Sequence, residues 1–270
     1  MQSSNPVLTR LGDAARQERA AGFSGYELKP APGYGYAPPQ APSTRMMTLD
    51  DVVVRTVALL AIVGIAGAAS WLLLPPSSPV TLLAVFGSMI SALVLGLVIS
   101  FARVTNPFVI GAYAVLEGVL LGVVSRYYEQ AFSGIVIQAI IGTFGVFAIM
   151  AVLYKMKVLR ATPRFTRMVI GALIGIVVLS LANWLFAMFG HNLGLIQYNT
   201  QGKVGWLPIV FALVCIVVGA LTFVIDFDAI EQGVRYGLPE RYAWYCAFGL
   251  LVGLVFLYWQ ILRLLSYLRR

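Results

Sequence analysis

Residues Thr56 to Ala102 read TVALLAIVGIAGAASWLLLPPSSPVTLLAVFGSMISALVLGLVISFA. No charged residue interrupts this stretch, and the turn PPSSP at 75–79 divides it into two apolar runs. A helix needs about 20 mostly apolar residues to cross a bilayer, and successive prolines end a helix. The stretch therefore predicts two membrane-spanning helices joined by a tight turn.

Five further apolar runs follow, so the chain is predicted to span the membrane seven times. Thr48 and Asp51 have the spacing of a capping box, which predicts that a helix starts just before the first run. The expected fold is an all-α membrane protein, a seven-transmembrane-helix bundle over residues 51–270. Breaking the runs at prolines, glycines and charges places the spans near 53–74, 80–102, 107–125, 134–154, 168–189, 206–230 and 242–262.

The composition supports a membrane protein and excludes several other classes. Of the 270 residues, 60% are hydrophobic and 11% are charged, whereas soluble domains have about 45–50% apolar and about 25% charged residues. A cytosolic enzyme and a secreted disulfide-rich domain are therefore not expected. The net charge of +8 is concentrated in the N-terminal tail and in loops, so a nucleic-acid partner is not expected either.

Residues 1–50 have a different composition from the rest of the chain. The segment KPAPGYGYAPPQAPS (29–43) is rich in Pro, Gly and Tyr. Such a segment cannot bury a core, which predicts a disordered or polyproline-like tail. Most of the 19 Lys and Arg residues lie in this tail or in loops on its side of the predicted bundle. By the positive-inside rule, the N-terminus is expected in the cytoplasm.

The chain carries none of the short motifs that mark common catalytic sites. It has no H-E-x-x-H zinc motif, no P-loop and no G-x-S-x-G elbow, and His191 is its single histidine. We therefore expect neither enzyme activity nor a bound cofactor, and no metal ligand is assigned firmly.

Ionisable residues inside the predicted spans are candidates for function, because a charge in the bilayer is costly. Glu117 lies near the middle of the third span, one turn after Tyr113. The Tyr113 hydroxyl is well placed to donate a hydrogen bond to the Glu117 carboxylate. For Glu117, this structural role is slightly favoured over a functional one.

The sixth span ends in the acidic segment LTFVIDFDAIEQGVRYG (221–237). A helix turns by about 100° per residue, so Asp226 and Asp228 point to nearly opposite sides and cannot ligate one ion together. Asp228, Glu231 and Arg235 share a face, which is expected to be the wet, cytoplasmic one. Asp226 aligns with a stripe of small and polar residues and is predicted to be the buried carboxylate.

A carboxylate inside a helix bundle has two physical states open to it. It stays protonated, because burial disfavours the charged form, or it stays charged beside a cation. Either state would make Asp226 a proton-sensitive latch or a hard-oxygen ligand for Ca²⁺. The alternative, weighed equally, is that Asp226 only hydrogen-bonds a neighbouring helix and fixes the packing.

Several segments distributed over the chain point to one family. Together they resemble the Bax inhibitor-1/YccA-like family, in particular its bacterial branch with a long N-terminal tail, and the resemblance covers essentially the whole chain. The segments are SSNPVLTR, MTLDDVVVRT, AYAVLEGVLLGVVSRYYE, TPRFTRMV, DFDAIEQGV and LYWQILRLLSYLRR.

The resemblance implies six helices around a central last helix, in a bacterial inner (plasma) membrane, and a pH-sensitive leak of cations, mainly Ca²⁺. Eukaryotic relatives suppress stress-induced cell death, and an enteric relative is linked to a membrane quality-control protease. In leak-competent members an aspartate on the sixth helix pairs with one on the last helix, and an arginine near the end of the second helix locks one of them. The sixth-helix pattern falls on Asp226, with Ile230 four residues later, and Arg103 is the candidate arginine.

The chain departs from this pattern in its last helix. No Asp or Glu occurs from Arg241 to Arg270, and Gln260 or Phe256 stands where the second aspartate is expected. A two-carboxylate latch is therefore missing in its usual form, and Glu117 is the remaining acidic candidate across the bundle.

The leading expectation is a pH-modulated Ca²⁺ leak channel with Asp226 as its proton-sensitive group and Glu117 and Arg103 as partners. Ca²⁺ would then be the permeant ion, and the bilayer the main partner. The alternative is a non-transporting membrane regulator that binds other membrane proteins, such as a membrane-bound protease. A secondary transporter ranks third.

Overall fold

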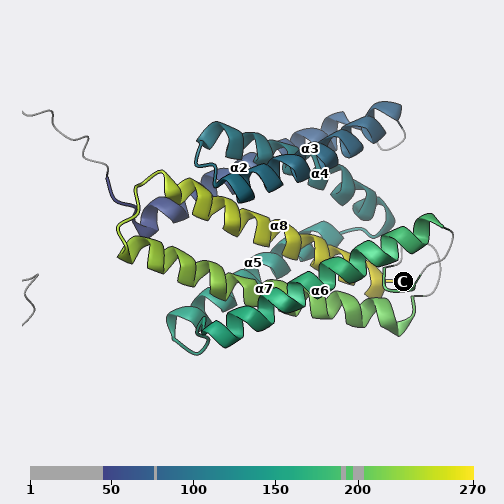
Figure 1. The fold of residues 1–270 in the computed structure, drawn as a ribbon. Helices are drawn as coiled ribbons and strands as arrows, with labels where there is room; N and C mark the ends of the chain where they lie inside the picture. Colours follow the sequence, from purple (N-terminus) through teal and green to yellow (C-terminus); the bar gives the residue numbers. More distant parts are fainter. Residues whose placement is uncertain (1–44, 76–77, 190–192, 197–203) are drawn as a thin grey trace, which may run out of the picture. The chain divides into compact units, whose positions relative to one another are not determined.

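The computed structural model describes residues 45–75, 78–189, 193–196 and 204–270. Most of the predicted tail (residues 1–44) and His191 lie outside the described residues. The described part holds seven helices, each long and apolar enough to cross a membrane, which confirms the predicted all-α bundle (Figure 1). They are α2 (Leu49–Leu73), α3 (Pro79–Ala102), α4 (Pro107–Ala131), α5 (Ile135–Lys155), α6 (Pro163–Met188), α7 (Trp206–Arg235) and α8 (Tyr242–Leu268).

Local sequence signals set the starts of four helices. Thr48 and Asp51 form the predicted capping box at the start of α2. The starts of α3, α4 and α6 each have a polar N-cap side chain followed by proline, with Ser78, Asn106 and Thr162 as the caps. Proline suits the first helical position because its missing N–H would have no partner there, and its fixed φ fits the helix.

Several helices extend beyond the spans predicted from the sequence. Helix α4 continues to Ala131 rather than 125, α7 to Arg235 rather than 230, and α8 to Leu268 rather than 262, while α6 begins at Pro163 rather than 168. The prediction ended spans at charged residues, which do not themselves stop a helix. Arg126, for example, stays within α4 and donates hydrogen bonds to the backbone carbonyls of Trp71 and Leu74.

Helix α8 lies at the centre of the bundle, as the family resemblance implies. In the most apolar stretch of α8, 56% of the residues are buried, against 17% in α2, α3 and α6. Helix α8 packs against α2, α4, α5 and α7, whereas α3 and α6 pack on the outside against α4 and α7. Figure 1 shows α8 running between the group formed by α2 and α4 and the group formed by α5 and α7.

Glycines bring α2 and α4 into close contact. A Cβ atom at Gly122 would lie 2.2 Å from the Gly67 carbonyl oxygen, and one at Gly118 would lie 2.7 Å from the Val63 carbonyl oxygen. Neither position has room for a side chain, so the two backbones meet directly. Such close approach is how small residues hold helices together in a membrane, where lipid is as apolar as the protein.

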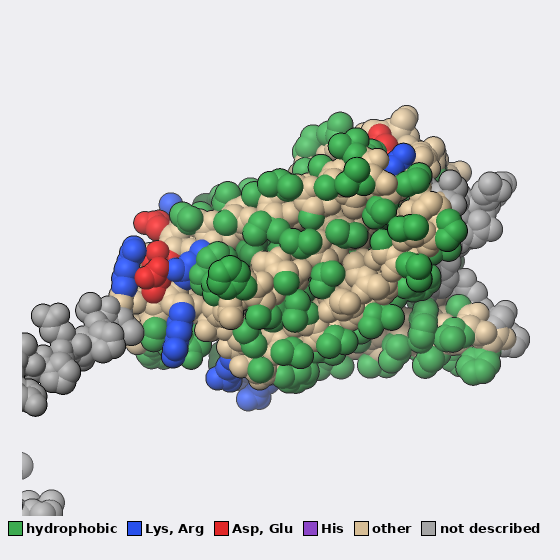
Figure 2. All heavy atoms as spheres, turned by 90° about the horizontal axis from the view of Figure 1, so that it is seen from above, with side chains coloured by type: hydrophobic (Ala, Val, Ile, Leu, Met, Phe, Trp, Pro, Cys, Tyr) green, Lys and Arg blue, Asp and Glu red, His purple; other side chains and the backbone are tan. Residues whose placement is uncertain are grey.

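The segment 45–48 and the α7–α8 loop lie together at one end of the bundle, here called the tail end. The Met47 N–H donates to the Leu238 carbonyl and the Glu240 N–H donates to the Arg45 carbonyl, each at 2.8 Å. Arg55 of α2 forms an ion pair with Glu240 at the same end. In Figure 2, hydrophobic side chains spread along the bundle, whereas charged side chains gather mostly at the end where α7 meets α8.

Candidate functional site

Asp226 lies on α7 and is half-buried in the bundle. Helices α7 and α8 run antiparallel, with Gly219 against Phe256 and Phe223 against Gly253. This register brings Asp226 to the first half of α8, where its carboxylate acts electrostatically on the Cys246 thiol. Within the described part of the chain, the Asp226 carboxylate makes no hydrogen bond and no ion pair. Asp226 is therefore a carboxylate without a partner beside the central helix.

The two α8 positions considered for a second carboxylate lie further along the bundle than Asp226. Phe256 packs on Gly219, two turns before Asp226 on α7. Gln260 is buried, and its side-chain oxygen accepts a hydrogen bond from Arg263. Neither side chain is at the level of Asp226, which has Cys246 as a titratable neighbour on α8.

Glu117 has the partner that its spacing predicts. The Tyr113 hydroxyl donates a hydrogen bond of 2.8 Å to the Glu117 carboxylate. The Tyr113 ring is buried and packs edge-on against Phe248 of α8, with 5.0 Å between ring centres. Helix α8 therefore packs against both α4, which carries Glu117, and α7, which carries Asp226.

Arg103 lies at the far edge of the bundle from α7. It ends α3 in a left-handed conformation with φ of 48°, and its side chain is exposed. Helix α3 packs on α4, and the Arg103 side chain forms no ion pair with a described residue. Asp226, Glu117 and Arg103 are thus not assembled into one cluster in this structure.

The acidic residues that follow Asp226 on α7 have partners. Asp228 accepts a hydrogen bond of 2.6 Å from the Gln232 side chain. The two carboxylate oxygens of Glu231 are bonded to Arg235 on the same helix and to the Tyr154 hydroxyl of α5. These groups lie at the tail end, as expected for a wet face, so Asp228 offers a chemically matched contrast to Asp226.

The described residues contain no cluster of three or more His, Cys, Asp or Glu side chains that could hold a metal ion. Ca²⁺ prefers six to eight oxygen ligands, and carboxylates supply most of the negative charge in its stable sites. Asp226 alone supplies one carboxylate, so a stable protein-only Ca²⁺ site is not formed by these residues. A role for Asp226 as a passing ligand for Ca²⁺ remains a prediction.

Sequence reasoning missed a buried cation on the central helix. Arg263 follows the predicted end of the last span, yet the structure places it within α8 with 8% of its surface exposed. Its guanidinium donates to Gln260 and lies 5.9 Å from the centre of the Phe211 ring. Gln260, Arg263 and Ser266 are all buried, and their three-residue spacing puts them on one face of α8. That spacing was the signal available in the sequence.

One comparison with known proteins gives a match and another gives none. A family model described as Bax inhibitor 1 like matches residues 5–270, which include all seven helices. No curated protein matches the chain. The match to the family model agrees with the resemblance seen in the sequence segments.

Proposed function

Because the chain belongs to the Bax inhibitor 1 like family, we propose that it is a leak channel, through which cations, Ca²⁺ among them, cross the membrane under the control of pH. The observation that carries this proposal is the position of Asp226 beside α8 without a hydrogen bond or ion pair from the described residues. A carboxylate that only held helices together would have such a partner.

The proposed mechanism follows from the two protonation states of Asp226. A charged carboxylate without a partner, away from bulk water, is stabilised by drawing in a cation or water molecules. A protonated carboxylate has no such need and lets α7 and α8 pack dry. No arginine among the described residues pairs with Asp226, so protonation has no such ion pair to break and only removes negative charge. Cation flux is therefore expected to rise with pH.

In this proposal the protein lies in a bacterial inner membrane, with the tail end of the bundle in the cytoplasm. Asp226 is the proton-sensitive group. Glu117 and Arg103 have lesser roles, because Glu117 and Asp226 lie on different helices that both pack on α8, and α3 lies on the outside of α4. The activity needs no catalytic residue and no bound cofactor.

A second candidate is a regulator that transports nothing and binds other membrane proteins, such as a quality-control protease. The specific observation in its favour is the charge on the central helix. Helix α8 has no carboxylate, and its buried Arg263 places a positive charge in the bundle. Such a charge opposes the passage of cations, and of divalent cations most strongly.

The experiment that tests the proposal is Ca²⁺ entry into liposomes containing the purified protein, between about pH 6 and about pH 8. The wild type should exceed empty liposomes, and its flux should increase with pH. Asp226→Asn should give a flux that no longer depends on pH, whereas Asp228→Asn, the matched change on the same helix, should behave as the wild type. Flux equal to that of empty liposomes would exclude the channel and favour the regulator.

A further inference from the structure

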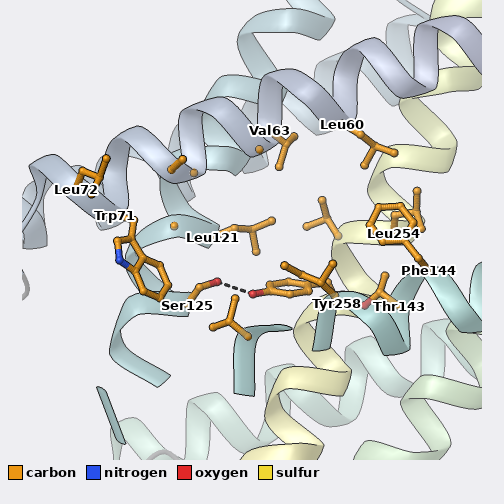
Figure 3. A pocket seen from close by; sticks show the side chains of 17 residues that line it. Leu60, Val63, Trp71, Leu72, Leu121, Ser125, Thr143, Phe144, Leu254 and Tyr258 are labelled. Carbon is orange, nitrogen blue, oxygen red and sulfur yellow. Dashed lines mark hydrogen bonds between the residues drawn. The ribbon is translucent and has the colours of Figure 1, made fainter. Parts of the chain in front are cut away.

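An apolar cavity of about 520 Å³ lies between α2, α4, α5 and α8, away from Asp226 (Figure 3). Gly64 and Gly67 of α2 and the buried Leu254 of α8 are among the residues that line it. At its rim Leu72 is 77% exposed and Phe144 is 47% exposed, so the cavity opens on the surface of the bundle between α2 and α5. In a membrane, that surface faces the hydrocarbon of the bilayer.

The cavity contains one pair of hydroxyl groups. The Ser125 and Tyr258 oxygens are 2.6 Å apart, and both side chains line the cavity, as Figure 3 shows. The pair has two protons, but the bond between the two oxygens uses only one. Among the described residues neither hydroxyl has another hydrogen-bond partner, and Ser125 is 5% exposed. The Glu129 carboxylate lies near enough to act electrostatically on Tyr258, but it accepts its hydrogen bonds from the backbone N–H groups of Gly134 and Val136. A buried donor without an acceptor is costly, so the pair lacks a hydrogen-bond acceptor inside the cavity.

The depth of the cavity matches one leaflet of a bilayer. Its wall on α2 runs from Leu60 to Leu72, which is about 18 Å along a helix, and half of the hydrocarbon core is about 15 Å. Ser125 lies about 9 Å from the end of α4 at Ala131. The hydroxyl pair is therefore close to the end of the bundle opposite the tail end.

A positive charge lies at this same end of the cavity. Arg126 follows Ser125 and donates hydrogen bonds to the carbonyls of Trp71, which lines the cavity, and Leu74. From the membrane surface inward, a cation thus lies beside the mouth of the cavity, followed by a hydroxyl donor and then by apolar walls. A phospholipid presents a phosphate, an ester carbonyl and an acyl chain in that order.

We propose that this cavity binds one acyl chain of an anionic phospholipid from the surrounding leaflet. The ester carbonyl accepts the second proton of the Ser125–Tyr258 pair, and the phosphate lies toward Arg126. The chain extends along α2 toward Leu60, and the glycines of α2 leave it room. The site is separate from Asp226 and does not depend on transport.

Gly64 allows a sharp test, because a Cβ atom there has no neighbour within 4 Å and points into open space. The Cβ atom of Gly64→Phe therefore meets no neighbour, and its ring should occupy the cavity that Gly64 lines. Gly87 on α3 has the same open surroundings and does not line the cavity, so Gly87→Phe is the matched control. The full chain would be purified in mild detergent with palmitoyl-oleoyl phosphatidylglycerol, and bound lipid counted by native mass spectrometry.

The wild type and Gly87→Phe should each retain one phospholipid after annular lipid is removed, and Gly64→Phe should retain none. Ser125→Ala combined with Tyr258→Phe leaves the apolar walls intact and should weaken retention about fivefold, the effect of one lost hydrogen bond. An ether-linked phosphatidylglycerol, which lacks the carbonyl, should bind wild type with the same loss.

Three results would overturn the proposal. The wild type would retain no phospholipid, Gly64→Phe would retain as much as Gly87→Phe, or a free fatty acid would displace the phospholipid at equal concentration. Equal retention of ester and ether lipids would refute the assigned role of the hydroxyl pair. Melting temperatures of all variants, measured in parallel, identify any loss of lipid that comes from unfolding.

Discussion

The two sides of the central helix differ in how their polar and small residues are used. On the side of α2 and α4, glycines bring backbones into contact and the carboxylate of Glu117 receives a hydrogen bond from Tyr113. On the side of α7, the carboxylate of Asp226 has no such donor among the described residues. Both carboxylates lie inside membrane-spanning helices, but only one is satisfied by the fold.

The presence of a hydrogen-bond donor at Glu117, and its absence among the described residues at Asp226, distinguish a carboxylate with a structural role from one that is a candidate for function. A buried polar group with a partner stabilises the packing around it, whereas one without a partner costs stability, and such a cost is a sign that the group has another role. The presence of a hydrogen-bond partner is therefore a better guide to the role of a carboxylate than its depth in the membrane. By this criterion Glu117 belongs to the packing of α4 on α8, and Asp226 is the residue to test for function.

The largest loss of stability is expected for a substitution where α2 and α4 are in contact. Gly122→Ala would place a methyl group 2.0 Å from the Ser70 hydroxyl and 2.2 Å from the Gly67 carbonyl, so the helices must separate. We expect the free energy of unfolding to fall by about 3 kcal/mol. Unfolding in mixed micelles with increasing dodecyl sulfate measures it. Gly111→Ala on the same helix meets no atom within 4 Å and should change little; equal effects would contradict the close packing.

A smaller loss of stability is expected at the tail end, where an ion pair joins α2 to the α7–α8 loop. Arg55 of α2 is paired with Glu240 of the α7–α8 loop and lies 5.2 Å from the centre of the Trp244 ring. Arg55→Ala should lower the free energy of unfolding by about 2 kcal/mol, because Glu240 loses its charged partner.

The control for this ion pair is Arg235, which pairs with Glu231 on an exposed surface. Arg235→Ala should leave stability nearly unchanged, because water and salt screen exposed pairs. If the two arginine variants were equally stable in the same mixed-micelle titration, Arg55 would not hold the sides of α8 together.

The smallest change in the free energy of unfolding is expected for variants that compare the two carboxylates directly. Tyr113→Phe removes the hydrogen bond to Glu117 and should lower the free energy of unfolding by about 1 kcal/mol. Asp226→Asn has no such bond to lose, and its effect should stay within about 0.5 kcal/mol. A loss of about 1 kcal/mol for Asp226→Asn, with unchanged pH dependence of flux, would show that Asp226 is a packing residue.

Local signals in the sequence were enough for the outline of the fold. The prolines at 79, 107 and 163 and the Thr48–Asp51 capping box mark helix starts, and four-residue spacing places Tyr113 against Glu117. Each of these signals depends on residues within one or two helical turns. For that reason they can be read without knowing which helices are neighbours.

Contacts between helices could not be read in the same way. The meeting of Gly67 with Gly122 depends on the register of α2 against α4, which no local pattern fixes. The burial of Arg263 was missed because a charge was taken as the end of a span, although an arginine stem packs readily along apolar surface. Asp226 and Arg103 lie apart in this structure because α3 packs on α4 and α7 packs on α8, and no local pattern shows which helices are neighbours.

The proposed entry of water and cations beside Asp226 can be tested through its neighbour on α8, Cys246. In a Cys215→Ser background Cys246 is the single thiol of the chain. The measurement is its rate of modification by a water-soluble, positively charged methanethiosulfonate, with the protein in liposomes at about pH 8. Cys246 should react, and Asp226→Asn should slow the reaction because the charge that attracts the reagent is gone. A thiol that stays unmodified in the folded protein but reacts fully after unfolding would contradict the proposal.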